Sequence, residues 1–308
     1  MDFPVADAHC DFLYGAMEYG YTPDAVIRDQ MISLNALKEG HVALQTFACW
    51  TDDKLRTPRL QQCLTMIDSY WEMLRRHEDM VPFSAGFDPM SGKIASFLTV
   101  EGAEPCEGSL ALLRSFYRLG VRAMSFTWNS NNEFAGAALG KRQKGLTLFG
   151  KEAVREMNRL NMAVDVAHLS DDGIYDVLDC STRPVMASHS NARGVLKHPR
   201  SLPDDLIRGI ALGGGVIGVS FYSPQLVARG RATLADVVAH IIHIVRIGGI
   251  HCCCFGSDFD GMGSSSSALK NSAEFPLLCE ALLKAGFSES EVALIAYGNL
   301  ARFYSELL

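Results

Sequence analysis

Residues 162–180 read MAVDVAHLSDDGIYDVLDC and contain one complete unit of strand and helix. The apolar run at 162–168 is short, which favours a buried strand, and the amphipathic stretch after it opens on Ser170 and two aspartates, as helices commonly do. Apolar runs of the same kind recur along the chain, and amphipathic helical stretches lie between them. These runs are 4–9, 41–50, 94–102, 121–128, 183–190, 215–222 and 251–259.

A strand followed by a helix, repeated about eight times in somewhat over 250 residues, predicts a (β/α)8 barrel, the TIM barrel. A doubly wound open sheet is the alternative. No linker rich in proline or in charge divides the chain, so we expect residues 1–308 to form a single barrel domain. We expect the segments 19–40 and 129–146 to be long insertions that wall a pocket.

The composition excludes several classes of function. The chain is 48% hydrophobic and 20% charged, as in an ordinary globular protein, and its net charge of -7 argues against a nucleic-acid-binding surface. No apolar stretch approaches the roughly 18 residues of a membrane span, and no leader precedes the first motif, so we expect a cytoplasmic protein without a membrane partner. The nine cysteines include no CxxC pair, which predicts reduced thiols.

Polar side chains stand where five of the apolar runs end. Any one of them is most simply a buried polar residue, but in a barrel the carboxyl ends of the strands converge on one rim, so together they favour a shared site. On an extended strand, side chains two residues apart share a face, which brings His9 and Asp11 together and turns Cys10 away. The residues are His9, Asp11, Glu101, His168, His189 and Asp258.

Histidine, aspartate and glutamate are ligands suited to zinc or a similar divalent ion. Five protein ligands are too many for one tetrahedral zinc that keeps a position open for water. We therefore predict two ions about 3.5 to 4 Å apart, bridged by Glu101, with His9 and Asp11 on one ion and His168 and His189 on the other. A water held between the ions would lose a proton near neutral pH and become a nucleophile.

Six motifs occur in an order and spacing that the chain shares, over nearly its whole length, with one known family. They are DAHCD (7–11), TVEGAE (99–104), DVAHLS (165–170), ASHSNA (187–192), PRSLPDD (199–205) and GSDFDG (256–261). The chain resembles the membrane dipeptidase (renal dipeptidase) family of binuclear zinc peptidases, within the amidohydrolase-like barrels.

The resemblance implies a zinc-dependent dipeptidase that cleaves free dipeptides, tolerates a D-residue at their C-terminal position, and pairs as a homodimer. It places the metal ligands at His9, Asp11, Glu101, His168 and His189, the acid/base group at Asp258, and the arginine for the substrate carboxylate at Arg200. A guanidinium can hold a carboxylate with two hydrogen bonds and so exclude longer peptides. The alternative for Arg200 is a solvated loop cation ahead of a helix.

The sequence departs from the family at Trp128, where the mammalian enzymes carry a histidine that contacts the scissile carbonyl. An indole donates one hydrogen bond and carries no positive charge, so Asn129, Asn131 or Asn132, or the ions, must polarise the carbonyl. We expect Trp128 to narrow the pocket toward small side chains.

Other functions stay open at this stage. A binuclear amidohydrolase for cyclic or acylated amino acids would use the same scaffold, and a barrel without catalysis would serve as a binding protein. His240 and His243 lie one turn apart on an expected helix, and we expect them to pack against the barrel rather than bind an ion.

Overall fold

The computed structural model describes residues 3–141 and 144–308, and eight of its strands close into a parallel ring. Neighbours around the ring are β2, β1, β9, β8, β7, β6, β5 and β4, and β2 pairs with β4 to complete the circle. The strands are β1 (Val5–Asp7), β2 (Val42–Trp50), β4 (Ile94–Glu101), β5 (Ala123–Ser125), β6 (Ala163–Asp165), β7 (Met186–Ala187), β8 (Val216–Val219) and β9 (Cys253–Phe255). The predicted TIM barrel is confirmed, and every predicted strand run contains one of these strands.

A ninth strand, β3 (Met80–Pro82), was not predicted. It pairs in parallel with the first residues of β4, while β5 pairs with later residues of β4. Three residues are too few to give a recognisable alternation of apolar and polar side chains in the sequence.

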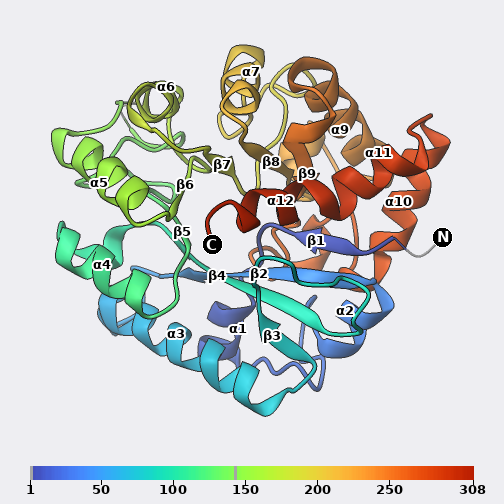
Figure 1. The fold of residues 1–308 in the computed structure, drawn as a ribbon, viewed down its shortest axis with the longest axis horizontal. Coiled ribbons are helices and arrows are strands. Elements are labelled where there is room, and N and C mark those ends of the chain that lie inside the picture. Colours follow the sequence, from blue (N-terminus) through green and yellow to red (C-terminus); the bar gives the residue numbers. More distant parts are fainter. Residues whose placement is uncertain (1–2, 142–143) are drawn as a thin grey trace.

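Helices surround the ring, as Figure 1 shows. Several begin as their sequences predict: the Ser170 side chain caps α6 by accepting from Gly173 N, and Thr147 caps α5 in the same way through Gly150 N. The helices are α1 (Phe12–Tyr19), α2 (Leu34–Glu39), α3 (Arg59–Arg76), α4 (Leu110–Arg118), α5 (Leu148–Arg159), α6 (Asp171–Cys180), α7 (Asp204–Leu212), α8 (Ser223–Leu226), α9 (Leu234–Gly248), α10 (Phe275–Lys284), α11 (Glu289–Ala293) and α12 (Asn299–Ser305).

The last helix, α12, lies across the middle of the ring of strands (Figure 1). Its Tyr304 stacks on Phe97 of β4, with ring centroids 3.6 Å apart, and its hydroxyl lies 2.9 Å from Thr46 Oγ1 of β2. Phe97 and Glu101 lie four residues apart on one strand and so share a face. The apolar plug formed with α12 therefore occupies one end of the barrel, and Glu101 stands at the other.

Candidate active site

The candidate residues stand at the carboxyl ends of the strands, and most of them lie in the turn just beyond. Glu101 is the last residue of β4, whereas the others follow β1, β6, β7 and β9 by two to four residues. The prediction that one extended strand carries both His9 and Asp11 is wrong, because β1 ends at Asp7 and Asp11 is already the N-cap of α1. The early start of α1 bends the chain, and the two side chains still meet.

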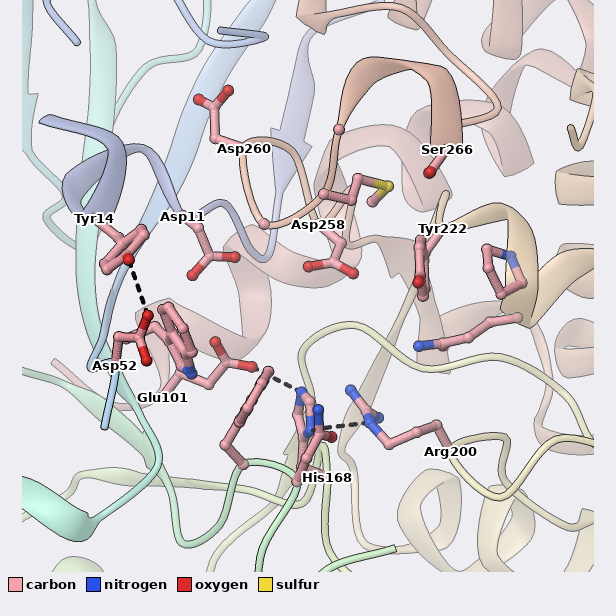
Figure 2. A pocket seen from close by; sticks show the side chains of 18 of the residues that line it. Asp11, Tyr14, Asp52, Glu101, His168, Arg200, Tyr222, Asp258, Asp260 and Ser266 are labelled. Atoms are coloured by element: carbon pink, nitrogen blue, oxygen red, sulfur yellow. Dashed lines mark hydrogen bonds and ion pairs between the residues drawn. The ribbon is translucent and has the colours of Figure 1, made fainter. Parts of the chain in front are cut away.

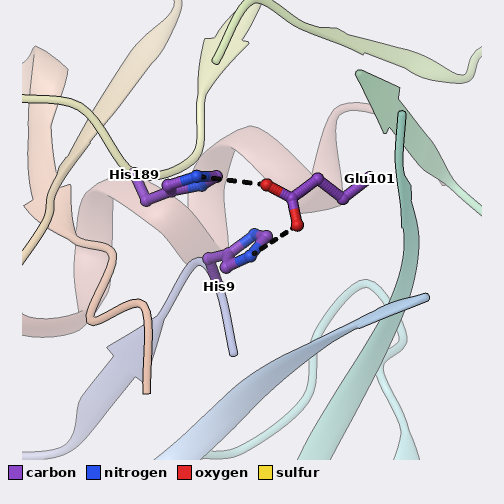
Figure 3. A group of neighbouring side chains, drawn as sticks. All are labelled: His9, Glu101 and His189. Atoms are coloured by element: carbon purple, nitrogen blue, oxygen red, sulfur yellow. Dashed lines mark ion pairs between the residues drawn. The ribbon is translucent and has the colours of Figure 1, made fainter. Parts of the chain in front are cut away.

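Glu101 lies at the centre of this group, as Figure 3 shows. Its Oε1 is 2.8 Å from His168 Nε2 and 3.4 Å from His189 Nε2, while its Oε2 is 3.6 Å from His9 Nε2. His9 Nε2 in turn lies 3.4 Å from Asp11 Oδ2. One carboxylate thus faces histidines on both sides, which is the arrangement that a bridging ligand requires.

The donor set fits divalent cations. Ligand atoms of His9, Glu101 and His189 lie within 4.8 Å of one another, and so do those of His9, Asp11 and Asp258. Both His9 Nε2 and Asp11 Oδ1 are buried without a hydrogen-bond partner among the described residues. Buried polar atoms are normally satisfied, so these two mark a place where the fold leaves coordinating atoms free.

Burial and charge favour the ligand forms of three of these side chains. Against burial, the Glu101 carboxylate raises the pKa of His9 well above its ordinary value. Burial, and then the Arg200 cation, lower the pKa of His168 to about 4, and burial and His9 hold the pKa of His189 well below its ordinary value. Burial alone would raise the pKa of Glu101, but His9 and His168 hold it well below its usual range. Two neutral imidazoles and an ionised carboxylate are the forms that bind metal.

Asp258 faces this group from the turn after β9. Burial raises its pKa to about 8, with Asp11 and Glu101 adding to the rise and His9 opposing it. Asp258 and His168 both adopt positive φ, at 64° and 69°, which non-glycine residues do only when the surrounding structure holds them there. These turns aim both side chains back over the ends of the strands.

Arg200 lies in the same cluster, although it comes from the loop between β7 and α7. It is only 5% exposed, and its Nε and Nη2 lie 3.0 Å from His168 Nδ1 and 2.9 Å from His189 Nε2. The alternative of a solvated loop cation is therefore wrong. Burial lowers its pKa to about 10, so Arg200 stays charged at neutral pH.

Asn129 contacts the same imidazole. Its Oδ1 lies 3.0 Å from His168 Nδ1, so that Asn129 can accept a hydrogen bond from the ring nitrogen that points away from Glu101. This contact orients His168, a role that the sequence did not suggest for Asn129.

The cluster opens into a cavity of about 840 Å³, shown in Figure 2. In this view the carboxylates of Asp11 and Asp258 lie above that of Glu101. Arg200 lies across from Asp52 and Tyr14, which share a 3.2 Å hydrogen bond. Both predicted insertions contribute to its wall, the first with Tyr19, Tyr21, Arg28 and Asp29, and the second with Asn129 and Leu139. Residues 142 and 143 of the second insertion lie outside the described residues.

Trp128 lies on the cavity wall and is 39% exposed. Its ring centroid is 4.9 Å from that of Trp50 and 6.3 Å from that of His168. Trp50 reaches the site because the register of β2 places it opposite Glu101 of β4. Two indoles therefore form the wall beside Glu101. That Trp128 narrows the pocket toward small side chains stays a prediction.

Two buried aspartates brace the strand ends below the candidate ligands. Asp7 accepts hydrogen bonds from Ser257 N at 2.7 Å and from Gln45 Nε2 at 2.9 Å, which ties β1 to its neighbours on both sides. Asp165 accepts from Ser188 N at 3.0 Å and so ties the end of β6 to the end of β7. In the motifs DAH (7–9) and DVAH (165–168) an aspartate precedes a candidate ligand histidine by two or three residues, and this spacing is the sequence signal for such a bracing acid.

The helix histidines were predicted to pack rather than bind an ion. His240 is fully buried and its Nδ1 accepts from Ala192 N at 3.0 Å, while His243 Nε2 lies 2.7 Å from Asp204 Oδ1. The first contact holds α9 against the loop between β7 and α7, and the second holds it against the first residue of α7, which confirms the packing. Neither histidine belongs to a metal-binding group found among the described residues.

Comparison with known proteins gives one consistent family. The model of the membrane dipeptidase family, peptidase family M19, matches residues 1–307. An uncharacterized dipeptidase of Schizosaccharomyces pombe is 32% identical over 293 residues, which cover 88% of this chain and 70% of that protein. A second uncharacterized dipeptidase of the same yeast is 40% identical over 223 residues, or 71% of this chain and 54% of its own length.

Dipeptidase 3 of Mus musculus is 31% identical over 325 residues, covering 99% of this chain and 65% of the mouse protein. The chain thus spans about half to 70% of the length of these relatives. Among solved structures, a dipeptidase described as an M19 metallopeptidase superposes with a TM-score of 0.89 at 25% identity, covering 98% of both chains.

A metallopeptidase from Rhodobacter sphaeroides, solved with a phosphinate mimic of L-Ala-D-Ala, has the same fold, with a TM-score of 0.89 at 24% identity over the whole of both chains. Within residues 3–141 and 144–308, none of the helices combines the length and the apolar character needed to cross a bilayer.

Proposed function

The chain belongs to the membrane dipeptidase family, the metallopeptidase family M19, and we propose that it hydrolyses the peptide bond of free dipeptides. The observation that carries the proposal is the place of Arg200. A buried guanidinium stands 3.0 Å from His168, which itself contacts the central Glu101. A cation held at a fixed short distance from a hydrolytic centre suits a substrate whose carboxylate lies one residue from the cleaved bond.

We assign two zinc ions to the cluster, with Glu101 between them, His9 and Asp11 on one side, and His168 and His189 on the other. Ions bound there would polarise the scissile carbonyl and lower the pKa of a water. The ring nitrogens support this assignment. His189 Nδ1 lies 2.8 Å from Ser188 Oγ and can donate to it, which leaves Nε2 unprotonated toward Glu101.

The tautomer of His168 links that assignment to Arg200. If Nε2 of His168 is a ligand, Nδ1 carries the proton and donates to Asn129 Oδ1. Nδ1 then no longer accepts from Arg200 Nε. His189 Nε2, as a ligand, no longer accepts from Arg200 Nη2 either. The guanidinium loses both imidazole partners and has donors for the substrate carboxylate.

Asp258 is our candidate for the proton carrier. Its carboxyl lies beside His9 and Asp11, and the raised pKa of a buried carboxyl suits a group that takes a proton and gives it back. In the proposed reaction it accepts the proton of the attacking water and returns it to the departing amine. Trp128 and Asn129 line the substrate side of the same site.

The finer assignments rest on the family resemblance. We propose that the enzyme accepts both L,L and L,D dipeptides; the Rhodobacter sphaeroides metallopeptidase of the same fold binds a mimic of L-Ala-D-Ala. The single domain over 1–308, the cytoplasmic location, the homodimer and the absence of nucleic-acid and membrane partners stay predictions from the sequence.

The test is amino-acid release from a panel of L,L and L,D dipeptides, with protein stripped by a chelator and then reloaded with zinc, manganese or cobalt. We expect release that depends on the metal, and none from tripeptides or N-acylated amino acids. If fully loaded protein releases nothing from any dipeptide but cleaves a cyclic or acylated amide, the amidohydrolase alternative replaces this proposal.

A further inference from the structure

An ion pair beside the active site joins two of its turns. Arg193 Nη1 and Nη2 lie 2.5 and 2.8 Å from the two carboxylate oxygens of Asp171, in the two-point geometry that makes such pairs strong. Asp171 is the first residue of α6 and follows His168 by three residues. Arg193 belongs to the loop between β7 and α7, which carries Arg200.

The same guanidinium also holds the segment around Arg200. Arg193 Nε donates to the carbonyl of Ser201 at 2.9 Å, and Nη2 donates to the carbonyl of Pro199 at 3.3 Å. These two carbonyls flank Arg200 in the chain. Arg193 thus binds the peptide on both sides of Arg200 and anchors it to the helix that begins beside His168.

The loop is already closed by its backbone. Leu202 N donates to the carbonyl of Asn191 at 2.7 Å, and Arg193 N donates to the carbonyl of Leu202 at 2.8 Å. The side-chain bonds of Arg193 are therefore not needed to shut the loop. They add a fixed link between the turn of His168 and the backbone of Arg200, whose side chain contacts His168 at 3.0 Å.

We propose that Arg193 is a positioning residue, which with Asp171 fixes Arg200 at the distance from the hydrolytic centre that a dipeptide carboxylate requires. This inference rests on the proposed dipeptidase function. Without the clamp, the loop keeps its fold but Arg200 samples several positions, and the bound carboxylate is held less well. Because the loss falls on substrate binding, KM changes and kcat does not.

The variant Arg193→Met removes all the donors and keeps the length of the side chain. In the metal-loaded enzyme we expect KM for a dipeptide to rise about tenfold, or about 1.4 kcal/mol of binding, with kcat within about twofold of wild type. Metal content should stay unchanged. If Arg193→Met fails to fold, Arg193→Lys keeps the positive charge but cannot make the two parallel hydrogen bonds of a guanidinium, and it should raise KM about threefold.

The matched control is Lys151→Met. Lys151 Nζ lies 2.8 Å from Asp176 Oδ1 and links α5 to the same helix α6. The two ion pairs are similarly exposed, at 33% and 29% for the side chains of Lys151 and Asp176 and at 27% and 30% for those of Arg193 and Asp171. Losing the control pair should leave KM and kcat within about twofold of wild type.

A double variant shows whether Arg193 acts through Arg200. In an Arg200→Met background, the change Arg193→Met should lower kcat/KM no further, because the group that it positions is gone. An unchanged KM in Arg193→Met, or a full tenfold additional loss in the double variant, would overturn the inference while leaving dipeptide hydrolysis by the wild type intact. A wild type without dipeptidase activity would instead overturn the proposed function.

Discussion

Replacing Arg200 with methionine should lower kcat/KM for a dipeptide by about two orders of magnitude. A hydrogen bond to a charged group contributes about 1.5 to 3 kcal/mol, and a carboxylate gripped by both arms of a guanidinium makes two. Because Arg200 is 5% exposed, water does not screen these bonds. Taking the low end for each gives about 3 kcal/mol, which corresponds to about 150-fold.

The assay measures initial rates of amino-acid release over a range of dipeptide concentrations, with Arg200→Lys as the conservative comparison. Lysine keeps a point charge but loses the two-point geometry, so we expect about a tenfold loss for it. Metal analysis of each variant is the control, because Arg200 also contacts His168 and His189. If Arg200→Met keeps its metal and its kcat/KM stays within about threefold of wild type, Arg200 does not bind the substrate carboxylate.

Three further perturbations follow from contacts within the barrel. A Cβ at Gly261 would lie 2.2 Å from Asp11 Oδ2, so Gly261→Ala should displace that carboxylate and lower the zinc content of purified protein. A zinc content equal to that of the wild type would contradict the proposal that Asp11 is a ligand. A Cβ at Gly256 would lie 1.9 Å from the carbonyl oxygen of Ser188, so Gly256→Ala should cost about 2 kcal/mol or more, measured as a lower Tm. Arg159 and Arg114 lower the pKa of Glu156 to about 2, so the stability that Glu156 contributes is present above its ordinary pKa and is lost as the pH falls toward 2. Between pH 5 and 2, the free energy of unfolding of Glu156→Gln should therefore fall by about 1 kcal/mol less than that of the wild type, as measured by acid unfolding.

The strands of the barrel could be predicted because each is a short apolar run with a helical pattern after it. What the pattern could not give is where each strand stops. Apolar residues continue to Ala167, yet β6 stops at Asp165, because the Asp165 carboxylate accepts a hydrogen bond from the backbone N–H of Ala167 at 2.9 Å and turns the chain there. A side chain that accepts a hydrogen bond from the backbone two residues further on can end a strand although apolar residues follow it.

The same limit applies to the site. That His9, Glu101, His168 and His189 would gather was predictable, since parallel strand ends meet at one rim. The positive φ of His168, the burial of Arg200 and the contact of Asn129 with His168 Nδ1 were not, because each depends on residues distant in sequence. A loop arginine next to a proline has no periodic pattern that would reveal burial.

The bracing contacts explain why the candidate ligands can stand in turns and still be well placed. Turns are ordinarily the more mobile parts of a fold. Here Asp7 ties the turn of His9 to that of Asp258 through Ser257, and Asp165 ties the turn of His168 to that of His189 through Ser188. Both acids are buried among hydrogen-bond donors, so their bonds are strong and little contested by water. Each bracing acid therefore fixes the distance between the two turns in its half of the site, and a ligand carried by a turn is held nearly as well as one carried by a strand.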